Sequence, residues 1–340
     1  MSFESKPPAW PGNRTTAGER SCGRGRWPPV WDWIRQYSIV ATMIATFAAF
    51  CLLRPDSFFT VFVFKSILRD CAPTLILALG VTFVLVMNAY DLSLGGAIAL
   101  CATVAVLLAS SDRAGLGTAP VVALTLAFGL ALGLINGVLV AYLALPSFIL
   151  TIATGTIFVG VSLQLTGSSS IFEGIPAPYI AIADGEILGV SNQVFIAAGA
   201  LLASHIVFRY TQVGLHMYAV GSNAEAARQS GINTQLLQAM GFGLVGLTAA
   251  VGGILLTSEA GAANPNTGVG LLLPAYAAAF LGAAMGGAGL FTAVGTALGA
   301  LYLQVVGTGL TVLNLSGSTV LTVEGAILGA AVLVARLNRR

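Results

Sequence analysis

The chain has 340 residues, of which 56% are hydrophobic and 8% charged, with 41 glycines and a net charge of +2. Ordinary soluble domains carry roughly 25% charged residues, so this composition excludes such a domain and indicates a polytopic membrane protein. The cysteines are widely spaced, and with two histidines no metal site of the paired-cysteine or HExxH type is expected. The membrane part has no basic face, which argues against nucleic-acid binding. The chain also has no Gly-x-Ser-x-Gly motif, which argues against an intramembrane hydrolase.

The first 36 residues differ in composition from the rest of the chain. Residues 1–36 are rich in Pro, Gly, Arg and Ser and lack an early apolar core, so we expect a basic, disordered cytoplasmic tail and not a signal peptide.

The remainder, 37–340, is expected to be an all-α transmembrane domain. A bilayer core of about 30 Å needs roughly 20 apolar residues per helix. The apolar runs predict about ten transmembrane helices, near residues 37–53, 66–88, 92–110, 119–143, 147–166, 193–210, 236–257, 271–288, 290–309 and 319–335.

The distribution of Lys and Arg predicts the orientation of these helices. With ten spans and a cytoplasmic tail, the 211–235 segment and the C-terminus are also cytoplasmic, which places most of the 15 Lys and Arg residues there. Residues 167–192 then form the largest external loop, suited to docking or gating. The sequence GLALG at 129–133 resembles GTALG at 295–299, in spans that run in opposite directions, so we expect two inverted-repeat halves.

Several polar residues lie within or beside the apolar runs. A carboxylate near membrane depth is costly, and we expect Asp91 to cap the following helix, with Ser93 in its first turn; solute contact is the alternative. Asn136 needs a hydrogen-bond partner, so contact between helices is expected, with solute binding as the alternative. Thr151 and Thr154 either bond back to backbone carbonyls or line a pathway.

A polar island at 218–233, YAVGSNAEAARQSGIN, separates two long apolar runs. We expect a short helix over Glu225 to Arg228 that ends at Ser230 and Gly231, because glycine commonly ends helices. This exposed segment is the place where a water-soluble partner is expected to bind, although an ordinary cytoplasmic loop is the simpler alternative.

Four short segments, which follow one another along the chain in the same order as in the family, resemble membrane permease subunits of ABC importers of the ribose, galactose and autoinducer-2 class. They cover roughly residues 65–335. The segments are Asp91-Leu92-Ser93 with Gly95, Gly133-Leu-Ile-Asn136-Gly137, Leu145 to Thr151 with Thr154 and Gly155, and Gly221-x-Asn223 to Ile232, followed by Asn264-Pro265-Asn266. Asn88 and Tyr90 depart from the usual pattern before the first segment, so both are candidates for tuning solute choice.

The resemblance implies a bacterial inner-membrane transport subunit with several partners. They are an ATP-binding subunit, a second permease chain, identical or paralogous, an extracytoplasmic solute-binding protein and the lipid bilayer. The coupling residues toward the ATPase subunit would be Gly221, Asn223, Glu225, Ala226, Ala227, Arg228, Ser230 and Gly231. Docking of the binding protein would involve Asp184, Glu186, Asn264 and Asn266, and the solute would be a monosaccharide, sugar alcohol or similar small polyol.

The chain lacks the motif for ATP hydrolysis. A P-loop needs Gly-Lys followed by Ser or Thr, whereas the only lysines, Lys6 and Lys65, do not follow glycine. We therefore expect no catalytic residue and no cofactor on this chain, with ATP and Mg²⁺ bound by the partner subunit. The alternatives are an ABC permease for branched-chain amino acids and an ion-coupled transporter, for which Asp91 and Glu324 are the only candidate coupling groups.

Overall fold

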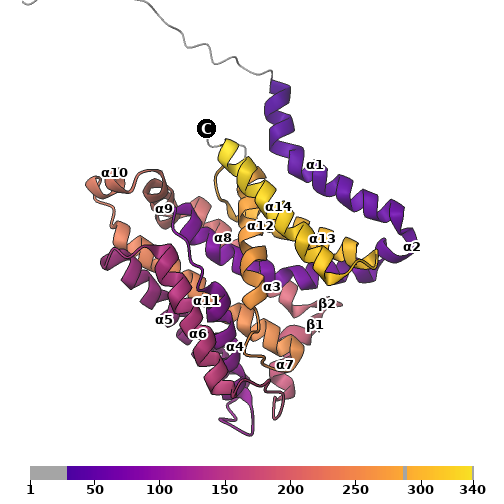
Figure 1. Ribbon diagram of the computed structural model, residues 1–340, viewed down its shortest axis with the longest axis vertical. Helices are drawn as coiled ribbons and strands as arrows, with labels where there is room; N and C mark the ends of the chain where they lie inside the picture. The colour runs from indigo at the N-terminus through magenta and orange to yellow at the C-terminus, as the bar shows by residue number, and fades with distance from the viewer. Residues whose placement is uncertain (1–28, 286–288, 339–340) are drawn as a thin grey trace, which may run out of the picture.

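The computed structural model describes residues 29–285 and 289–338, which are almost entirely helical (Figure 1). The part of the predicted tail at 1–28 lies outside the described residues. Helix α1 begins at Pro29, so residues 29–36 belong to a helix and the prediction of a disordered tail was wrong for them. The apolar residues Val30, Trp31 and Ile34 follow helical spacing there, which extends the first apolar run toward the N-terminus.

In the described part of the chain, a helix occupies most of each of the ten predicted spans. These helices are α1 (Pro29–Leu53), α3 (Val61–Val86), α4 (Leu94–Ala109), α5 (Thr118–Tyr142), α6 (Ser147–Thr166), α8 (Asn192–Tyr210), α11 (Thr234–Ala260), α12 (Leu272–Met285), α13 (Ala293–Val312) and α14 (Gly317–Asn338). By length and composition, six helices in the described part are able to cross a membrane: α3, α5, α6, α8, α11 and α13. The all-α polytopic fold is confirmed, and the number of spans stays a prediction.

The remaining elements are short. They are α2 (Pro55–Phe58), α7 (Ala177–Asp184), β1 (Glu186–Ile187), β2 (Val190–Ser191), α9 (Gln212–Ser222), α10 (Ala224–Gln229) and the 3-10 turn η1 (Val269–Leu271). Strands β1 and β2 pair antiparallel, with Glu186 opposite Ser191, through a tight turn in which Leu188 and Gly189 both have positive φ. The 167–192 segment thus contains only α7 and this hairpin, both too short to span a bilayer.

Helix α3 lies at the centre of the bundle. It packs against α8, α11, α12 and α13, and nearly every side chain from Cys71 to Val86 is buried. By contrast, α5 and α6 expose large apolar side chains, among them Ile135 and Ile149. Such faces suit lipid or a second membrane chain.

Small residues bring pairs of helices into backbone contact. A Cβ at Gly133 of α5 would lie 2.2 Å from the Phe242 carbonyl oxygen of α11, and one at Gly299 of α13 would lie 2.1 Å from the Ala278 carbonyl oxygen of α12. Only glycine permits such an approach. Both the 129–133 and the 295–299 sequences therefore lie at close helix crossings.

The ends of the bundle differ in the segments that they carry (Figure 1). The start of α1, the end of α14, and the short helices α9 and α10 lie in the upper half of the view. Helix α7, the β1–β2 hairpin and the loop after α4 lie in the lower half. Segments predicted to share the cytoplasmic side are thus found at one end.

Candidate functional site

The polar island folds into two short helices, α9 and α10, separated by Asn223. Asn223 caps α10, since its Oδ1 accepts a hydrogen bond from Ala226 N at 3.0 Å. After α10, Gly231 adopts the left-handed conformation with φ of 84° and allows the chain to reverse. The predicted short helix, ended by Ser230 and Gly231, is confirmed.

The eight predicted coupling residues divide into an exposed set and an inward set. Exposed are Asn223, Glu225, Ala226, Arg228, Ser230 and Gly231. Ala227 is buried against the main apolar core and Gly221 is half-buried, so these two hold the segment on the bundle. They are poorly placed to meet a soluble partner directly.

The exposed face of α10 carries one ion pair. Glu225 Oε2 lies 2.8 Å from Arg228 Nη2, one helical turn away. The hydrogen bond and positive charge of Arg228 lower the pKa of the Glu225 carboxyl, which therefore stays ionised. Both side chains are exposed, so the pair adds little stability and remains accessible to charged groups of another protein.

Helix α9 rests on the end of α3. Asn88 Nδ2 donates a 2.5 Å hydrogen bond to the Gly221 carbonyl oxygen. A Cβ at position 221 would lie 1.8 Å from the Val86 carbonyl oxygen, so the two backbones touch. The contact therefore links the coupling segment to the turn between α3 and α4.

Asn88 also terminates α3. Its φ of 56° is left-handed, and Ala89 N and Asn88 N donate to the carbonyl oxygens of Val84 and Leu85 at 3.0 Å each. This is the hydrogen-bond pattern of a Schellman motif, in which asparagine is the usual substitute for glycine. The position of Asn88 is thus explained by helix termination, and its influence on solute choice stays a prediction.

Asp91 lies in the same turn and is 1% exposed. Its Oδ1 accepts hydrogen bonds from Ser93 N at 2.9 Å and Ser93 Oγ at 2.5 Å. Ser93 Oγ in turn accepts a 2.8 Å bond from Asn136 Nδ2 of α5. A buried carboxylate is therefore stabilised by a short polar chain.

The prediction that Asp91 caps the next helix, with Ser93 in its first turn, was wrong in register. Helix α4 begins at Leu94, Ser93 occupies the N-cap position without a side-chain cap, and Asp91 bonds two residues ahead. An Asx-type turn satisfies the carboxylate before the helix begins, because aspartate bonds readily to the backbone two residues on.

Two further helices hold this turn. Tyr276 of α12 binds the backbone of Asp91: its hydroxyl accepts from Asp91 N at 2.8 Å and donates to Asp91 O at 3.0 Å. Thr151 of α6 accepts from Leu92 N at 3.0 Å through Oγ1 and donates to Ser147 O at 2.8 Å. Thr154, half-buried, bonds back to Thr151 O at 3.3 Å. The residues that were predicted either to line the translocation pathway or to stabilise the structure are thus brought together around one turn.

A family model for the permease component of branched-chain amino acid transport systems matches residues 63–335. The chain belongs to this permease family. It is 31% identical to the ribose import permease protein of Escherichia coli K12 over 89% of this chain and 94% of the relative, and equally identical to that of Haemophilus influenzae over 88% and 92%. It is 36% identical to the autoinducer 2 import system permease protein of Salmonella choleraesuis, over 71% and 68%. No solved structure matches the chain significantly.

At the opposite end of the permease, the four residues predicted to meet a binding protein are all exposed: Asp184, Glu186, Asn264 and Asn266. The loops that carry them are joined. Ile171 and Ala263 form an antiparallel bridge, and Asn264 Nδ2 donates to Ser170 Oγ at 3.2 Å. Residues about ninety positions apart thus make one polar surface, whose role in docking stays a prediction.

Nothing in the sequence indicated one residue of this permease site, Tyr276, and the sequence led to a different role for another, Gly221. Tyr276 lies in an apolar run and carries no local signal of its bond to Asp91, since the contact depends on how α12 packs. Gly221 was predicted to contact the partner, whereas the structure uses it to contact α3. The one signal of the close approach between α9 and α3 in the sequence is that Gly221 lies inside a short helix.

Proposed function

We propose that this permease is the membrane-spanning subunit of a bacterial ABC importer for a monosaccharide, sugar alcohol or similar small polyol. The observation that carries the proposal is its match, along almost the whole of both chains, to ribose import permeases. The family description names branched-chain amino acids, but the relatives at high coverage are named for ribose and autoinducer 2 import, which favours the sugar class.

Permease components of ABC importers are non-catalytic, and the ATPase activity resides in a separate subunit that binds ATP and Mg²⁺. We assign the exposed face of α10 to contact with that subunit. When the ATPase subunits close, they would push α10 and α9 toward the bundle, because Ala227 and Gly221 hold this segment against it. The push reaches the turn that contains Asp91 through Asn88.

The proposal includes ten spans in two inverted halves, with both termini in the cytoplasm. It is supported by the position of α9, α10, the start of α1 and the end of α14 at one end of the bundle (Figure 1). A second permease chain, identical or paralogous, would cover part of the exposed apolar face of α5 and α6. A loaded binding protein would dock at the other end, on the joined loops near Asn264 and Asp184.

Ion coupling is disfavoured by the surroundings of Asp91. Its Oδ1 already accepts two hydrogen bonds from Ser93, and the residue is 1% exposed. A proton- or sodium-coupling carboxylate must exchange with an aqueous pathway during each cycle. The geometry of Asp91 instead suits a fixed joint between helices.

The test is purification of the tagged permease from its native membrane in mild detergent, with mass spectrometry of the proteins that co-purify. We expect an ATP-binding subunit, and we expect less of it with Glu225→Ala and Arg228→Ala combined. Uptake of D-ribose, D-galactose, xylitol and L-leucine by the recovered complex in proteoliposomes then identifies the solute class. ATP-dependent uptake of leucine alone would refute the sugar assignment, and uptake by the permease without an ATPase subunit would refute the importer.

A further inference from the structure

A buried amide lies at the outer end of α3, α8 and α11. Gln193 of α8 is 0% exposed, and neither Oε1 nor Nε2 has a hydrogen-bond partner among the described residues. Burying an amide without a partner is unfavourable, so an apolar side chain of similar size would stabilise the bundle better. Packing among the described residues therefore does not explain glutamine at this position.

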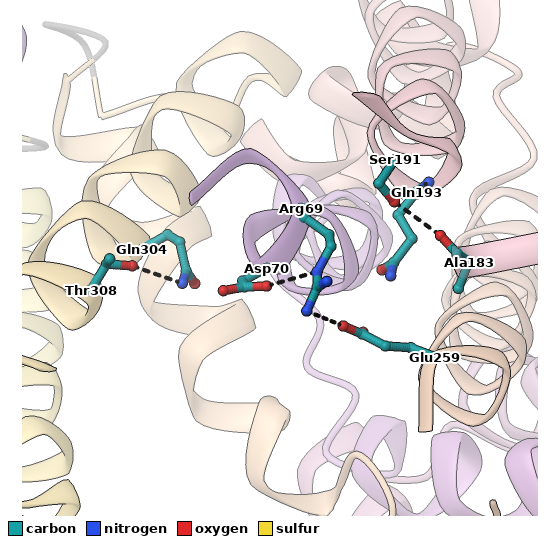
Figure 2. Close-up of polar contacts among 8 residues, drawn as sticks. All are labelled: Arg69, Asp70, Ala183, Ser191, Gln193, Glu259, Gln304 and Thr308. Atoms are coloured by element: carbon teal, nitrogen blue, oxygen red, sulfur yellow. Dashed lines mark hydrogen bonds and ion pairs between the residues drawn. The ribbon is translucent and has the colours of Figure 1, made fainter. Parts of the chain in front are cut away.

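The amide points at a group of charged residues. Figure 2 shows the Gln193 side chain directed toward Arg69 of α3 and Glu259 of α11. Arg69 Nη2 lies 2.9 Å from Glu259 Oε1, and Arg69 Nε lies 3.3 Å from Asp70 Oδ1. The Arg69 and Glu259 side chains are 48% and 28% exposed, so a solute is able to reach them, whereas the buried Gln193 amide becomes accessible only when these side chains move apart.

Helix register places these polar groups in one layer. Ala72, Ala197 and Leu255 pack together in a dry cluster between α3, α8 and α11. Each helix carries a polar residue three or four positions further toward its outer end: Arg69 beyond Ala72, Gln193 beyond Ala197 and Glu259 beyond Leu255. Residues at that spacing share a helix face, so the polar layer directly covers the apolar one.

The chemistry of this layer fits hydroxyl groups. Arg69 supplies donors only, the carboxylates of Asp70 and Glu259 supply acceptors only, and the Gln193 amide supplies both. Adjacent hydroxyls of a sugar or polyol donate and accept in the same way. One positive and two negative charges disfavour an anionic ligand such as a sugar phosphate. No group of three potential metal ligands occurs in the described part of the chain, which disfavours a cation site.

The outer loops bring the site to the side from which a solute arrives. Ser191 Oγ donates to Ala183 O at 2.9 Å, as Figure 2 shows, and Ala183 N donates to Ser258 Oγ at 2.9 Å. These bonds hold the end of α7 and the start of α8 against the end of α11. The site thus lies beside the end of α7 and the start of α8.

We propose that Gln193, Arg69 and Glu259 form an entry subsite that binds the hydroxyl groups of a neutral sugar or polyol on the extracytoplasmic side. The inference rests on the proposed function, because it assigns the solute class to a place on this chain. The subsite receives the solute after the binding protein releases it and before the pathway opens. Its affinity is low, since a tight site would hold the solute back.

The direct test is saturation-transfer NMR of D-ribose with the permease and its ATPase subunit, without binding protein. Nanodiscs of phosphatidylcholine are used because that headgroup has no hydroxyl group to compete. Gln193→Met removes the amide at nearly constant shape, and Gln164→Met makes the same change at an exposed position of α6. We expect the ribose signal to fall about tenfold in Gln193→Met and in Glu259→Gln, and to persist in Gln164→Met.

A wild-type complex without a ribose signal would overturn the subsite. Equal signals in wild type and Gln193→Met would overturn it as well. Transport separates this failure from failure of the proposed function. If wild type and Gln193→Met import ribose, galactose or xylitol at equal rates, only the subsite is wrong. If the wild-type complex imports none of these solutes, the sugar-import function is wrong.

Discussion

Replacement of Gly221 by alanine tests whether α9 passes movement to the end of α3. The added Cβ would lie 1.8 Å from the Val86 carbonyl oxygen, and real Cβ atoms essentially never lie closer than 3.0 Å to such an atom. The end of α9 therefore has to move by at least about 1.2 Å away from α3. That movement breaks or strains the hydrogen bond from Asn88 Nδ2 to the Gly221 carbonyl oxygen.

The energetic cost follows from three contributions. Overpacking costs about 1–3 kcal/mol, and loss of the hydrogen bond costs about 0.5–1.5 kcal/mol. Alanine recovers about 1 kcal/mol relative to glycine inside a helix. We therefore expect α9 and α10 to be held less firmly by about 0.5–3.5 kcal/mol, which corresponds to roughly 2- to 400-fold more frequent local opening.

Hydrogen–deuterium exchange measured by mass spectrometry on the complex in nanodiscs reports this opening for peptides within 212–232. Solute transported per ATP hydrolysed is measured on the same preparation, and we expect it to fall in Gly221→Ala. Gly199→Ala is the matched control, because a Cβ at position 199 of α8 meets nothing within 4 Å. Exchange and coupling in Gly221→Ala equal to those of the control would refute the contact as a mechanical link.

The other predictions concern the Asp91 turn and α10. Tyr276→Phe leaves the Asp91 backbone N–H and C=O without their partner and should lower unfolding stability by about 1–3 kcal/mol, seen as a lower melting temperature than in Tyr302→Phe. Removing Glu225 and Arg228 together should weaken ATPase-subunit retention without lowering that temperature, because the pair is exposed; a lower temperature would contradict this. Since Arg228 lowers the Glu225 pKa, retention should stay constant from neutral pH down to the ordinary glutamate pKa and decline only as pH falls further.

Much of the fold could be predicted from the chain because its signals are local. Apolar runs of bilayer length located the long helices, and Ser230 and Gly231 marked the end of α10. Local signals also have limits. The predicted start of α4 was two residues too early, because an aspartate before an apolar run predicts a helix cap whether or not its side chain bonds to the helix.

The parts of the site that escaped prediction depend on contacts between distant helices. Tyr276 is 185 residues from Asp91, and the bond between them exists only because α12 packs beside the α3–α4 turn. Gln193 looks like an ordinary polar residue at a helix start, and its significance comes from its complete burial. Sequence patterns indicate which residues are polar, whereas the packing decides whether they meet water, another helix or a ligand.

The turn from Met87 to Ser93 is better placed than α3 to carry movement from the coupling segment into the bundle. Helix α3 packs against four other helices and is nearly fully buried from Cys71 to Val86, so a push along it would have to displace the whole core. The turn is held by individual side chains: Asn88 binds Gly221 at one end, and the other end is held by Asn136, Tyr276 and Thr151. Those side chains come from three helices, so a small displacement of the turn changes how α5, α6 and α12 meet.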